Sequence, residues 1–404
     1  MTGPGMTGPG GWTARTGLYF VLLFGAVNLF ADFAYEGARS VGGPFLAGLG
    51  ATGLVAGLVG GGGEFIGYAL RLVSGRWADR SGRYWLITFL GYLVQMVAVP
   101  MLALAGSWQA AAALMVAERM GKAIRNPPRD VMLSEAGEVI GRGWAFGVNE
   151  ALDQLGAFAG PIVVAVVYAA RHDYAIAFAW LAVPAAMVLL LVVTARFAFP
   201  KAGVIARAGD AQEVSGYPYV FWWYAAASGL VAFGFADYSL IAFHFAKGGV
   251  MPAVAVPVVY AFGMLAGGAG SLLFGKLYDH IGLKVLVPVT VAGAFFAPLV
   301  FMGGYSLAVF GVLLWGLSEG VHNSVMPAAV AAMIPAERRA GAYGLFTTIF
   351  GVAWFVGSAI EGALYDHSIL ALVIVAMAAQ LAALWPLLVA IRGTGQGTGT
   401  PAAR

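Results

Sequence analysis

The chain lacks cysteine, and it has few charged residues of either sign. Without cysteine there is no disulfide, no thiolate metal site and no cysteine nucleophile. Charged residues make up 10% of the 404 residues, against about 25% in a typical soluble domain. Hydrophobic residues reach 61%, so too few polar side chains remain to cover a water-soluble globule. The net charge of +3 does not indicate nucleic-acid binding. This composition is typical of a membrane protein.

Long apolar runs recur from Gly17 onward. A membrane-spanning helix needs about 20 mostly apolar residues, and twelve such runs fit the chain. The predicted spans are 17–40, 46–72, 84–106, 108–127, 143–170, 174–196, 218–246, 252–275, 284–303, 305–329, 339–363 and 368–391. Twelve spans predict an all-α membrane protein.

The basic residues predict the orientation. Lys and Arg near helix ends stay on the cytoplasmic side of a membrane. With a cytoplasmic N-terminus, all but three of the 22 Lys and Arg fall on that side, the exceptions being Arg39, Arg171 and Lys247. A miscounted span would invert every later loop and mix the two populations. We therefore expect a multi-pass protein of the cell inner (cytoplasmic) membrane with both termini in the cytoplasm, where 1–16 and 392–404 form disordered tails.

The sequence is internally duplicated. The string GRWADRSGR, which begins at Gly75, returns 200 residues later as GKLYDHIGLK, which begins at Gly275. Phe-Ala-Asp ending at Asp32 likewise returns ending at Asp237, and Glu118 corresponds to Glu319. We predict two pseudo-symmetric six-helix bundles around a central cavity, 17–199 and 218–391, joined by a cytoplasmic linker at 200–217. Transporters built from such repeats hold substrate between their halves.

The repeated loop motif and the twelve-run hydropathy resemble the major facilitator superfamily from Gly17 to Ile391. The resemblance implies a secondary transporter that works by alternating access. A second signature is partial: Gly147, Gly156, Gly160 and Pro161 have the spacing found on the fifth helix of the superfamily's proton-coupled drug antiporters, but Val164-Ala165 replaces the Gly-Gly pair that should follow.

The loop motif predicts a gate. Its glycines permit a tight turn, and Asp79 near a helix end can meet an arginine or a helix N-terminus. Alternatively, the charges only mark topology. Lys122, Arg125 and Arg129 form a basic stripe that we expect to leave the fourth helix where Pro127 and Pro128 break it. That stripe could pair with the gate or attract an anionic substrate such as an organophosphate. The predicted gating residues are Gly75, Asp79, Arg80, Gly82, Arg83, Arg119, Arg125, Arg129, Asp130 and Asp279.

Charges are distributed unequally among the spans. The third, sixth, ninth and twelfth have no charged residue in their interiors and only the amides Gln95 and Gln380, so we expect them to face lipid. The first, fourth, seventh and tenth carry carboxylates, which are costly in hydrocarbon and should face a protein or water-filled interior.

The amino-terminal half has more acids than bases in its predicted spans. These spans hold six carboxylates and only three arginines. The acids are Asp32, Glu36, Glu64, Glu118, Glu150 and Asp153. The bases are Arg39, Arg71 and Arg119. Because not all six can be paired, some should bind protons near neutrality. We predict proton coupling at Asp32, Glu36, Glu150 and Asp153; the alternative is a fully paired structural network.

The carboxyl-terminal half offers polar groups for substrate. Asp237 and His244 share one helix face, and Glu319, His322 and Asn323 share another. His322 could titrate, hydrogen-bond substrate or serve only structure. Two histidines and two carboxylates on different helices do not define a metal site, so neither a metal nor a cofactor is predicted. The predicted substrate-binding residues are Asn28, Arg39, Glu64, Glu118, Asp237, His244, Glu319, His322 and Asn323.

No enzyme motif is found. The string from Gly270 to Lys276 resembles a phosphate loop, but Leu277 replaces the required Ser or Thr. We predict a monomeric secondary active transporter in the lipid bilayer whose partners are protons and a small-molecule substrate, with no nucleic acid. Proton-coupled efflux of a cationic or zwitterionic organic compound is favoured. The alternatives are an organic anion or phosphorylated metabolite, a divalent metal, or a receptor or partner subunit that does not transport.

Overall fold

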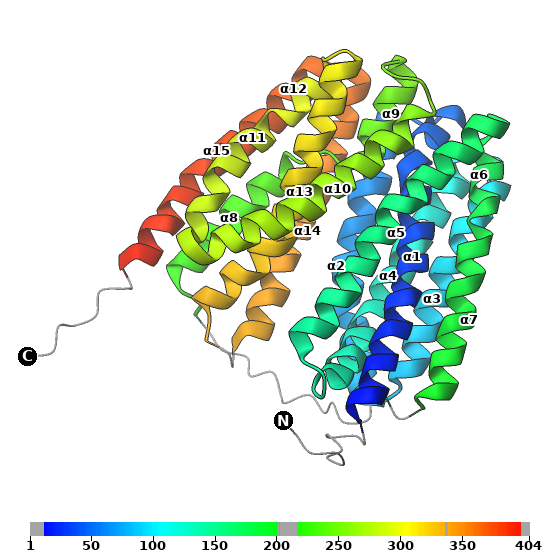
Figure 1. The fold of residues 1–404 in the computed structure, drawn as a ribbon. Helices are drawn as coiled ribbons and strands as arrows, with labels where there is room; N and C mark the ends of the chain where they lie inside the picture. The colour runs from blue at the N-terminus through cyan, green and yellow to red at the C-terminus, as the bar shows by residue number, and fades with distance from the viewer. Residues whose placement is uncertain (1–11, 201, 203–215, 336–337, 397–404) are drawn as a thin grey trace, which may run out of the picture. The chain divides into compact units, whose positions relative to one another are not determined.

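The computed structural model describes residues 12–200, 202, 216–335 and 338–396, and every regular element in these ranges is a helix (Figure 1). Nine helical stretches among them are long and apolar enough to cross a membrane. One of the nine, Ala255–Phe301, contains two predicted spans, and α4 and α13 coincide with two more. The all-α membrane fold is confirmed, and the helices are consistent with twelve spans.

The chain divides into two compact units. Unit 1 comprises Met1–Ala51, Ile66–Gly209 and Pro252–Ala261, and unit 2 comprises Thr52–Phe65, Asp210–Met251 and Phe262–Arg404. The first part of α2 (Gly53–Ser81) therefore belongs to unit 2, and the first part of α10 (Ala255–Ile281) belongs to unit 1. Each predicted half thus contributes one helical segment to the other unit.

The remaining helices lie within one unit each. Those of unit 1 are α1 (Ala14–Gly48), α3 (Tyr84–Met101), η2 (Leu102–Leu104), α4 (Trp108–Gly137), α5 (Arg142–Arg171), α6 (Tyr174–Trp180) and α7 (Ala182–Ala198). Those of unit 2 are α8 (Tyr219–Phe233), α9 (Tyr238–Gly248), η3 (Gly282–Val285), α11 (Leu286–Ala294), α12 (Phe296–Phe301), α13 (Tyr305–Met333), α14 (Arg339–His367) and α15 (Ile369–Gln396).

The predicted tails and linker are described only in part. Residues 1–11, 397–404 and most of 200–217 lie outside the described ranges. Residues 12–16, expected in the tail, are ordered: Trp12 is buried, and Thr13 caps the N-terminus of α1. Trp12 stacks on Phe199 with ring centroids 5.7 Å apart, so the start of α1 is fixed by aromatic packing beside the end of α7.

Helix α4 does not end at its prolines, so the prediction that Pro127 and Pro128 break it is wrong. Proline at 127 removes the N–H that would reach the carbonyl of Ala123. The Ser74 hydroxyl donates a hydrogen bond of 3.1 Å to that carbonyl instead. A neighbouring side chain that satisfies a freed carbonyl allows a membrane helix to continue through proline.

The repeated motif is mostly helical rather than a loop. Its first copy forms the last turns of α2, and its second copy forms the last turns of α10. The helices end in the same way, because Gly82 has φ +64° and Gly282 has φ +61°. Only glycine adopts this left-handed conformation without steric cost. The duplication is therefore preserved in the conformation of the backbone.

The seventh predicted span is broken into α8 and α9 at Gly234–Ala236. Asp237, its predicted helical-face residue, instead caps α9, and its carboxylate accepts a 2.8 Å hydrogen bond from the backbone N–H of Ser239. Asp32, its counterpart in the duplication, lies inside the continuous helix α1. The two halves have thus diverged at this position.

The glycines of the partial fifth-helix signature pack α5 against α1. A Cβ at Gly156 would overlap the carbonyl of Leu29, and one at Gly160 would overlap that of Phe33. Gly147 has no such neighbour within 4 Å. Two signature glycines therefore have a packing role that does not depend on any transport mechanism.

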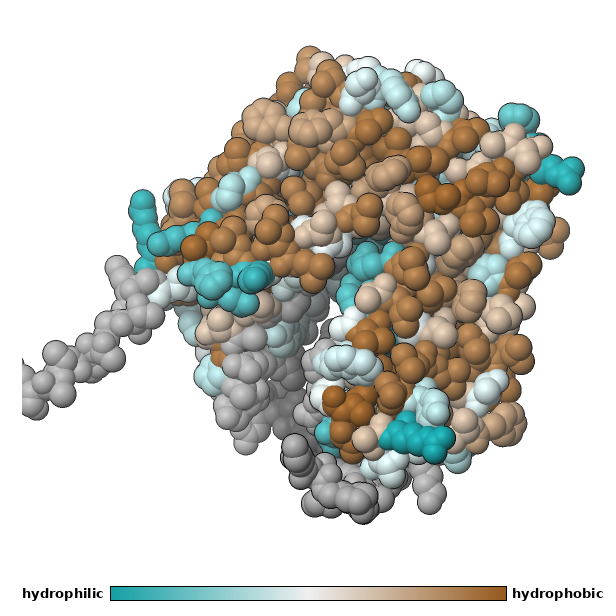
Figure 2. Space-filling model, in the orientation of Figure 1, coloured by the Kyte–Doolittle hydropathy of each residue, from teal (hydrophilic) through white to brown (hydrophobic). Residues whose placement is uncertain are grey.

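The surface turned to the viewer in Figure 2 is mostly apolar. On α3 the exposed side chains include Leu86, Leu90, Val94 and Val97, which form one stripe along the helix. An apolar stripe of this kind suits contact with lipid tails.

Candidate functional site

A buried polar cluster lies inside unit 1, centred on Arg125. Its members come from α1, α3, α4 and α5 and are Asn28, Asp32, Tyr92, Gln95, Glu118, Arg125, Arg129, Asn149 and Asp153. We call this set the Arg125 cluster. It brings together residues that the sequence assigned separately to proton coupling, substrate binding and gating.

Arg125 is almost fully buried, with 1% of its surface exposed. Its Nε donates to Gln95 Oε1 at 2.7 Å, and its Nη1 donates to the Tyr92 hydroxyl at 3.0 Å. Its Nη2 lies 3.7 Å from a carboxylate oxygen of Asp32. The amide of Gln95 also donates to Glu118 Oε1 at 3.0 Å. The planar guanidinium thus joins α4 to α3 and α1.

Asn28 is the second junction of the cluster. Its carbonyl oxygen accepts from the Tyr92 hydroxyl at 2.9 Å and from Arg129 Nη1 at 3.1 Å. Its amide nitrogen donates to Asn149 Oδ1 at 2.9 Å. Asn28 therefore has donors and acceptors satisfied within protein.

The two aspartates of the cluster share several basic neighbours. Asp32 lies 3.7 Å from Lys122 Nζ as well as from Arg125. Asp153 interacts electrostatically with Asp32, Arg129, Glu150 and Arg125. The basic stripe therefore lies beside the acids rather than beyond them, because α4 continues past its prolines.

The other predicted unit 1 acids have different surroundings. Glu36 is buried, accepts a hydrogen bond from the Tyr260 hydroxyl, and lies 3.9 Å from Arg39. Glu150 is exposed and accepts from the Gln154 amide at 3.0 Å. Of the four predicted proton-coupling residues, Asp32 and Glu150 both interact electrostatically with Asp153, while Glu36 pairs with Tyr260.

Unit 2 is built around the break between α8 and α9. The Gln380 amide donates a 3.1 Å hydrogen bond to the carbonyl of Gly234, which the break leaves without a helical partner. Asp237 is fully buried at the start of α9. A Cβ at Gly60 of α2 would lie 2.5 Å from an oxygen of Asp237, so the glycine run brings the backbone of α2 close to this carboxylate.

Aromatic rings surround the break. Phe235 stacks on Trp315 at 5.7 Å and meets Trp354 edge-on at 5.2 Å. The ring of His322 lies 6.1 Å from that of Phe235. Trp315 Nε1 donates to the carbonyl of Ala236 at 3.0 Å, which fixes the backbone of the break. We call Phe235, Tyr238, Trp315, His322 and Trp354 the aromatic cluster.

His244 lies apart from this cluster, near the other end of α9. Its Nδ1 is 3.2 Å from the Tyr365 hydroxyl. Asp366, the residue after Tyr365, accepts hydrogen bonds from the first N–H groups of α2 and lies 3.9 Å from Lys247. Asp237 and His244 therefore have different polar neighbours, the N–H of Ser239 for Asp237 and the Tyr365 hydroxyl for His244.

Two further carboxylates lie inside unit 2. Glu319 is partly buried on α13, and Glu64 is partly buried on the segment of α2 that belongs to unit 2. Glu361 on α14 is fully buried, and neither of its oxygens has a hydrogen-bond partner among the described residues. The side chain of Asn323 lies outside what the structure describes.

The predicted gating residues fall into two groups. Arg119, Arg125 and Arg129 are buried or partly buried on α4, where Arg119 lies 3.8 Å from Glu118 and Arg129 pairs with Asp130 at 2.7 Å. The others lie at the end of α2, at the start of α3 and at the end of α10; Asp79, Arg80, Arg83 and Asp279 are exposed there. Asp79 accepts a 2.8 Å hydrogen bond from the Tyr84 hydroxyl.

Sequence reasoning missed several members of these sites. Gln95 and Gln380 lie on helices that we expected to face lipid, yet both side chains are buried. Gln95 accepts a hydrogen bond from Arg125, and Gln380 donates one to the carbonyl of Gly234. Glu361, Tyr92 and Tyr260 were not assigned at all. A lone amide or carboxylate in an otherwise apolar span was the available signal, because such a group needs an internal position.

No group of three or more histidine, aspartate or glutamate side chains within the described ranges is arranged to hold a metal ion. The possible divalent-metal site formed by Asp237, His244, Glu319 and His322 is not assembled there.

The structure thus consists of apolar helical units with buried polar clusters. A sequence match shows the family to which such a chain belongs. The family model of the Major Facilitator Superfamily matches residues 19–358. The chain belongs to this superfamily. It is therefore a multi-pass membrane protein with a secondary-transporter fold.

Relatives and solved structures agree with that assignment. An uncharacterized protein of Mycobacterium tuberculosis is 43% identical over 372 residues, covering 90% of this chain and 91% of its own. A bacterial homologue of the human lysosomal transporter Spinster has a TM-score of 0.73 at 13% identity, covering 96% of this chain and 99% of its own. The peptide transporter POT has a TM-score of 0.76 at 16% identity, covering 92% and 94%. At these identities the structures show the fold alone.

Proposed function

We propose that this transporter exports a cationic or zwitterionic organic compound in exchange for protons. Transport as such follows from the superfamily. The observation that carries the proton coupling and the charge of the substrate is the environment of Glu361. This carboxylate is fully buried in an apolar helix and has no hydrogen-bond partner among the described residues.

A carboxylate in that position is expected to hold a proton. An ionised carboxylate without a partner is costly in a medium of low dielectric constant, so it takes up a proton instead. Among the described residues of unit 2, the basic residues lie near helix ends or outside the helices, at Lys247, Lys276, Lys284, Arg338, Arg339 and Arg392. Glu361 can therefore become charged only when water or a cation reaches it.

The aromatic cluster supports a cationic substrate. The faces of tryptophan, tyrosine and phenylalanine attract organic cations by about 0.5–2 kcal/mol each. Asp237 and Glu319 supply negative charge in the same unit, and Asp237 is adjacent in sequence to the break that the aromatic rings surround. In discontinuous transporter helices, such breaks are typical of binding sites.

The Arg125 cluster has a different proposed role. Its acids have basic neighbours, so we propose that Asp32 and Asp153 change protonation only when these contacts loosen during the transport cycle. The exposed residues Asp79, Arg80 and Arg83 are proposed to act as the gate, at the cytoplasmic side in the predicted orientation.

The direct test is transport in proteoliposomes with an imposed pH gradient. The compounds would first be selected by the rise in melting temperature that each gives the purified protein. Wild type, Glu361→Gln and Asp32→Asn are then compared for gradient-driven flux and for substrate exchange without a gradient. Loss of gradient-driven flux with exchange preserved in Glu361→Gln is the expected result.

Glu138→Gln is the matched control, since Glu138 is an exposed glutamate at the end of α4. If the flux through the wild type did not depend on the pH gradient, proton coupling would be refuted. Full coupling in Glu361→Gln would move the proton site elsewhere.

An anionic substrate is the second candidate. Lys122 is partly exposed, and its ammonium lies 3.8 Å from the Tyr35 ring centroid and 3.7 Å from Asp32, without a close hydrogen-bonded ion pair. Selection of organic phosphates rather than cations in the melting screen, with the response lost in Lys122→Gln, would favour this candidate.

A further inference from the structure

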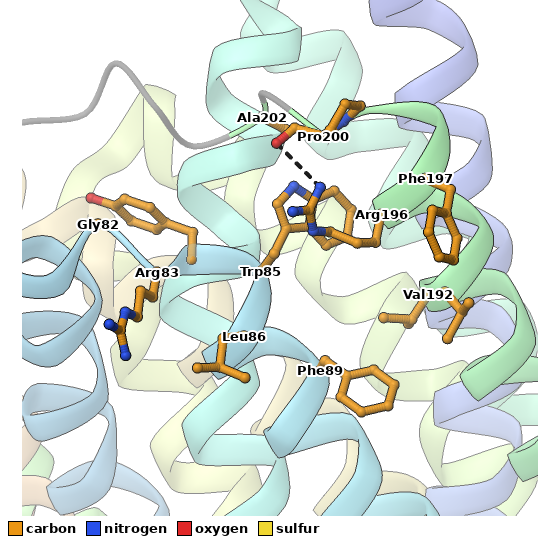
Figure 3. Close-up of a pocket in the computed structure, with 12 residues that line it drawn as sticks. Gly82, Arg83, Trp85, Leu86, Phe89, Val192, Arg196, Phe197, Pro200 and Ala202 are labelled. Carbon is orange, nitrogen blue, oxygen red and sulfur yellow. Dashed lines mark hydrogen bonds between the residues drawn. The ribbon is translucent and has the colours of Figure 1, made fainter.

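A cavity of about 590 Å³ opens in unit 1 between the start of α3 and the end of α7 (Figure 3). Its lining combines two arginines with aromatic and aliphatic side chains, among them Arg83, Trp85, Leu86, Phe89, Arg196 and Phe197. Two of its lining residues, Gly82 and Arg83, belong to the predicted gate, and no residue of the Arg125 cluster lines it.

The cavity is positively charged. Arg83 and Arg196 are its charged lining residues, and both are exposed. Neither forms an ion pair with any carboxylate of the described residues, and Arg196 donates a long hydrogen bond of 3.4 Å to the carbonyl of Pro200. Most of the guanidinium donors therefore remain available for an anion.

The N-terminus of α3 adds main-chain donors to the same cavity. Arg83 occupies the N-cap position, and its side chain does not cap the helix. The residues of the first turn, from Tyr84 to Leu86, line the cavity. Main-chain N–H groups at a helix N-terminus favour a phosphate, and here they act beside two arginines.

The wall of the cavity is fixed by packing. Trp85 is buried, and its indole N–H donates a 3.2 Å hydrogen bond to the carbonyl of Phe199. Phe199 in turn stacks on Trp12. The cavity is therefore held by an aromatic core rather than by loosely placed surface side chains.

The cavity lies at the ends of two candidate membrane spans. One candidate membrane span begins at Tyr84 and another ends at Ala198, so both lining helices have a terminus here. Further into the spans, the lining turns apolar and outward-facing: Leu86 on α3 is 44% exposed and Val193 on α7 is 36% exposed. In a bilayer these side chains face acyl chains, whereas the arginines are level with headgroups.

We propose that the cavity binds one anionic phospholipid. The headgroup phosphate lies between Arg83, Arg196 and the first turn of α3, and an acyl chain follows Leu86, Phe89 and Val193 along the outer surface. Basic pockets at the ends of membrane helices select anionic headgroups, which matches the charge and the place of this cavity. A free phosphate would use the arginines but not the apolar groove.

The test is native mass spectrometry of the full chain, purified in detergent and exposed to phosphatidylglycerol or to phosphatidylcholine. Wild type should retain one phosphatidylglycerol and no equivalent phosphatidylcholine. In the double variant Arg83→Gln/Arg196→Gln, the affinity for phosphatidylglycerol should fall about thirtyfold, since each basic residue near an anionic headgroup contributes about fivefold.

Two further variants make the result specific. Arg15→Gln/Arg392→Gln removes two exposed arginines that do not line the cavity, and it should retain the lipid as wild type does. Val193→Trp keeps both arginines and fills the cavity from α7, so it should lose the lipid even if the double variant fails to fold.

Three outcomes would overturn the proposal. Equal retention of phosphatidylglycerol in wild type and in both cavity variants would place the lipid elsewhere. If wild type retained phosphatidylcholine as well as phosphatidylglycerol, binding would not depend on the negative charge that the arginines are proposed to recognise. Displacement by inorganic phosphate alone would assign the cavity to a free anion.

Discussion

The Ser74 hydroxyl donates a hydrogen bond of 3.1 Å to the carbonyl of Ala123, four residues before Pro127. This bond joins α2 to α4 inside unit 1, at the point where proline leaves a carbonyl without its helical partner. Helix α4 continues past this point to Gly137, and that continuation places Arg129 on the same helix as Lys122 and Arg125.

Ser74→Ala should therefore destabilise the protein, because the carbonyl of Ala123 loses its donor in a buried site. The expected cost is about 1–2 kcal/mol, which corresponds to about 1–2 °C in Tm for a chain of this length. Thermal unfolding in one fixed detergent measures it. Ser81→Ala is the control, because the Ser81 hydroxyl is exposed and its hydrogen bonds are local, to the carbonyl of Trp77 and from the N–H of Arg83. Equal melting of the two variants would contradict this role of Ser74.

Sequence patterns predicted the helical class well because each span has to be long and apolar to cross a bilayer. They located α1, α5 and α14 to within a few residues at their starts. They failed at Pro127 and Pro128 because the partner of the freed carbonyl, Ser74, is distant in the sequence. A local rule about proline cannot include a donor from another helix.

The candidate site was predicted only in part for a similar reason. Periodicity correctly puts Asn28 and Asp32 on one face of α1, because i and i+4 positions are neighbours on a helix. It does not show which groups face them from other helices. Arg125 reaches Asp32 from α4, and Gln95 reaches Arg125 from α3, a helix that composition alone assigned to lipid.

The Arg125 and Asp32 side chains should be energetically coupled. Arg125→Gln leaves Asp32 without its most buried basic neighbour, so we expect a loss of about 3–5 kcal/mol in the free energy of unfolding. Asp32→Asn in the Arg125→Gln background should restore part of it, since the unpaired charge is gone. A double-mutant cycle of unfolding free energies measures the coupling.

The control for this cycle is Arg392→Gln combined with Asp32→Asn. Arg392 is exposed on α15 and lies in the other unit, so these changes should be additive. Additivity of Arg125→Gln with Asp32→Asn as well would show that the 3.7 Å contact has no energetic weight.

The glycine run of α2 offers a matched pair of substitutions. A Cβ at Gly60 would lie 2.5 Å from Asp237 Oδ1, whereas one at Gly62 meets nothing closer than a Phe355 ring atom at 3.5 Å. Gly60→Ala should cost about 1–3 kcal/mol through overpacking against the start of α9. Gly62→Ala should be neutral or slightly stabilising, because alanine favours the helix.

Comparison of Tm and of substrate exchange in these two variants checks the prediction. We expect Gly60→Ala to lower both quantities and Gly62→Ala to lower neither. If Gly62→Ala were as harmful as Gly60→Ala, the run would serve general helix packing rather than the approach of α2 to Asp237.

The carboxylate of Asp366 caps a helix from a distant part of the chain, and this cap should outweigh its ion pair. One oxygen accepts from the N–H of Gly53 at 2.8 Å and the other from that of Leu54 at 2.9 Å. These are the first residues of α2, whose N–H groups have no helical acceptor. The ammonium of Lys247 lies 3.9 Å away, but its side chain is 53% exposed.

Removal of the cap by Asp366→Ala should lower the free energy of unfolding by about 1–2 kcal/mol. Removal of the ion pair by Lys247→Gln should change it by only about 0–1 kcal/mol, because an exposed pair is screened by solvent. Hydrogen exchange at the start of α2 distinguishes the two causes. Asp366→Ala should speed exchange of the amides of Gly53 and Leu54, while Lys247→Gln leaves it unchanged. Faster exchange in both variants to the same extent would mean that Lys247 holds Asp366 in its capping position and that the two contacts act as one.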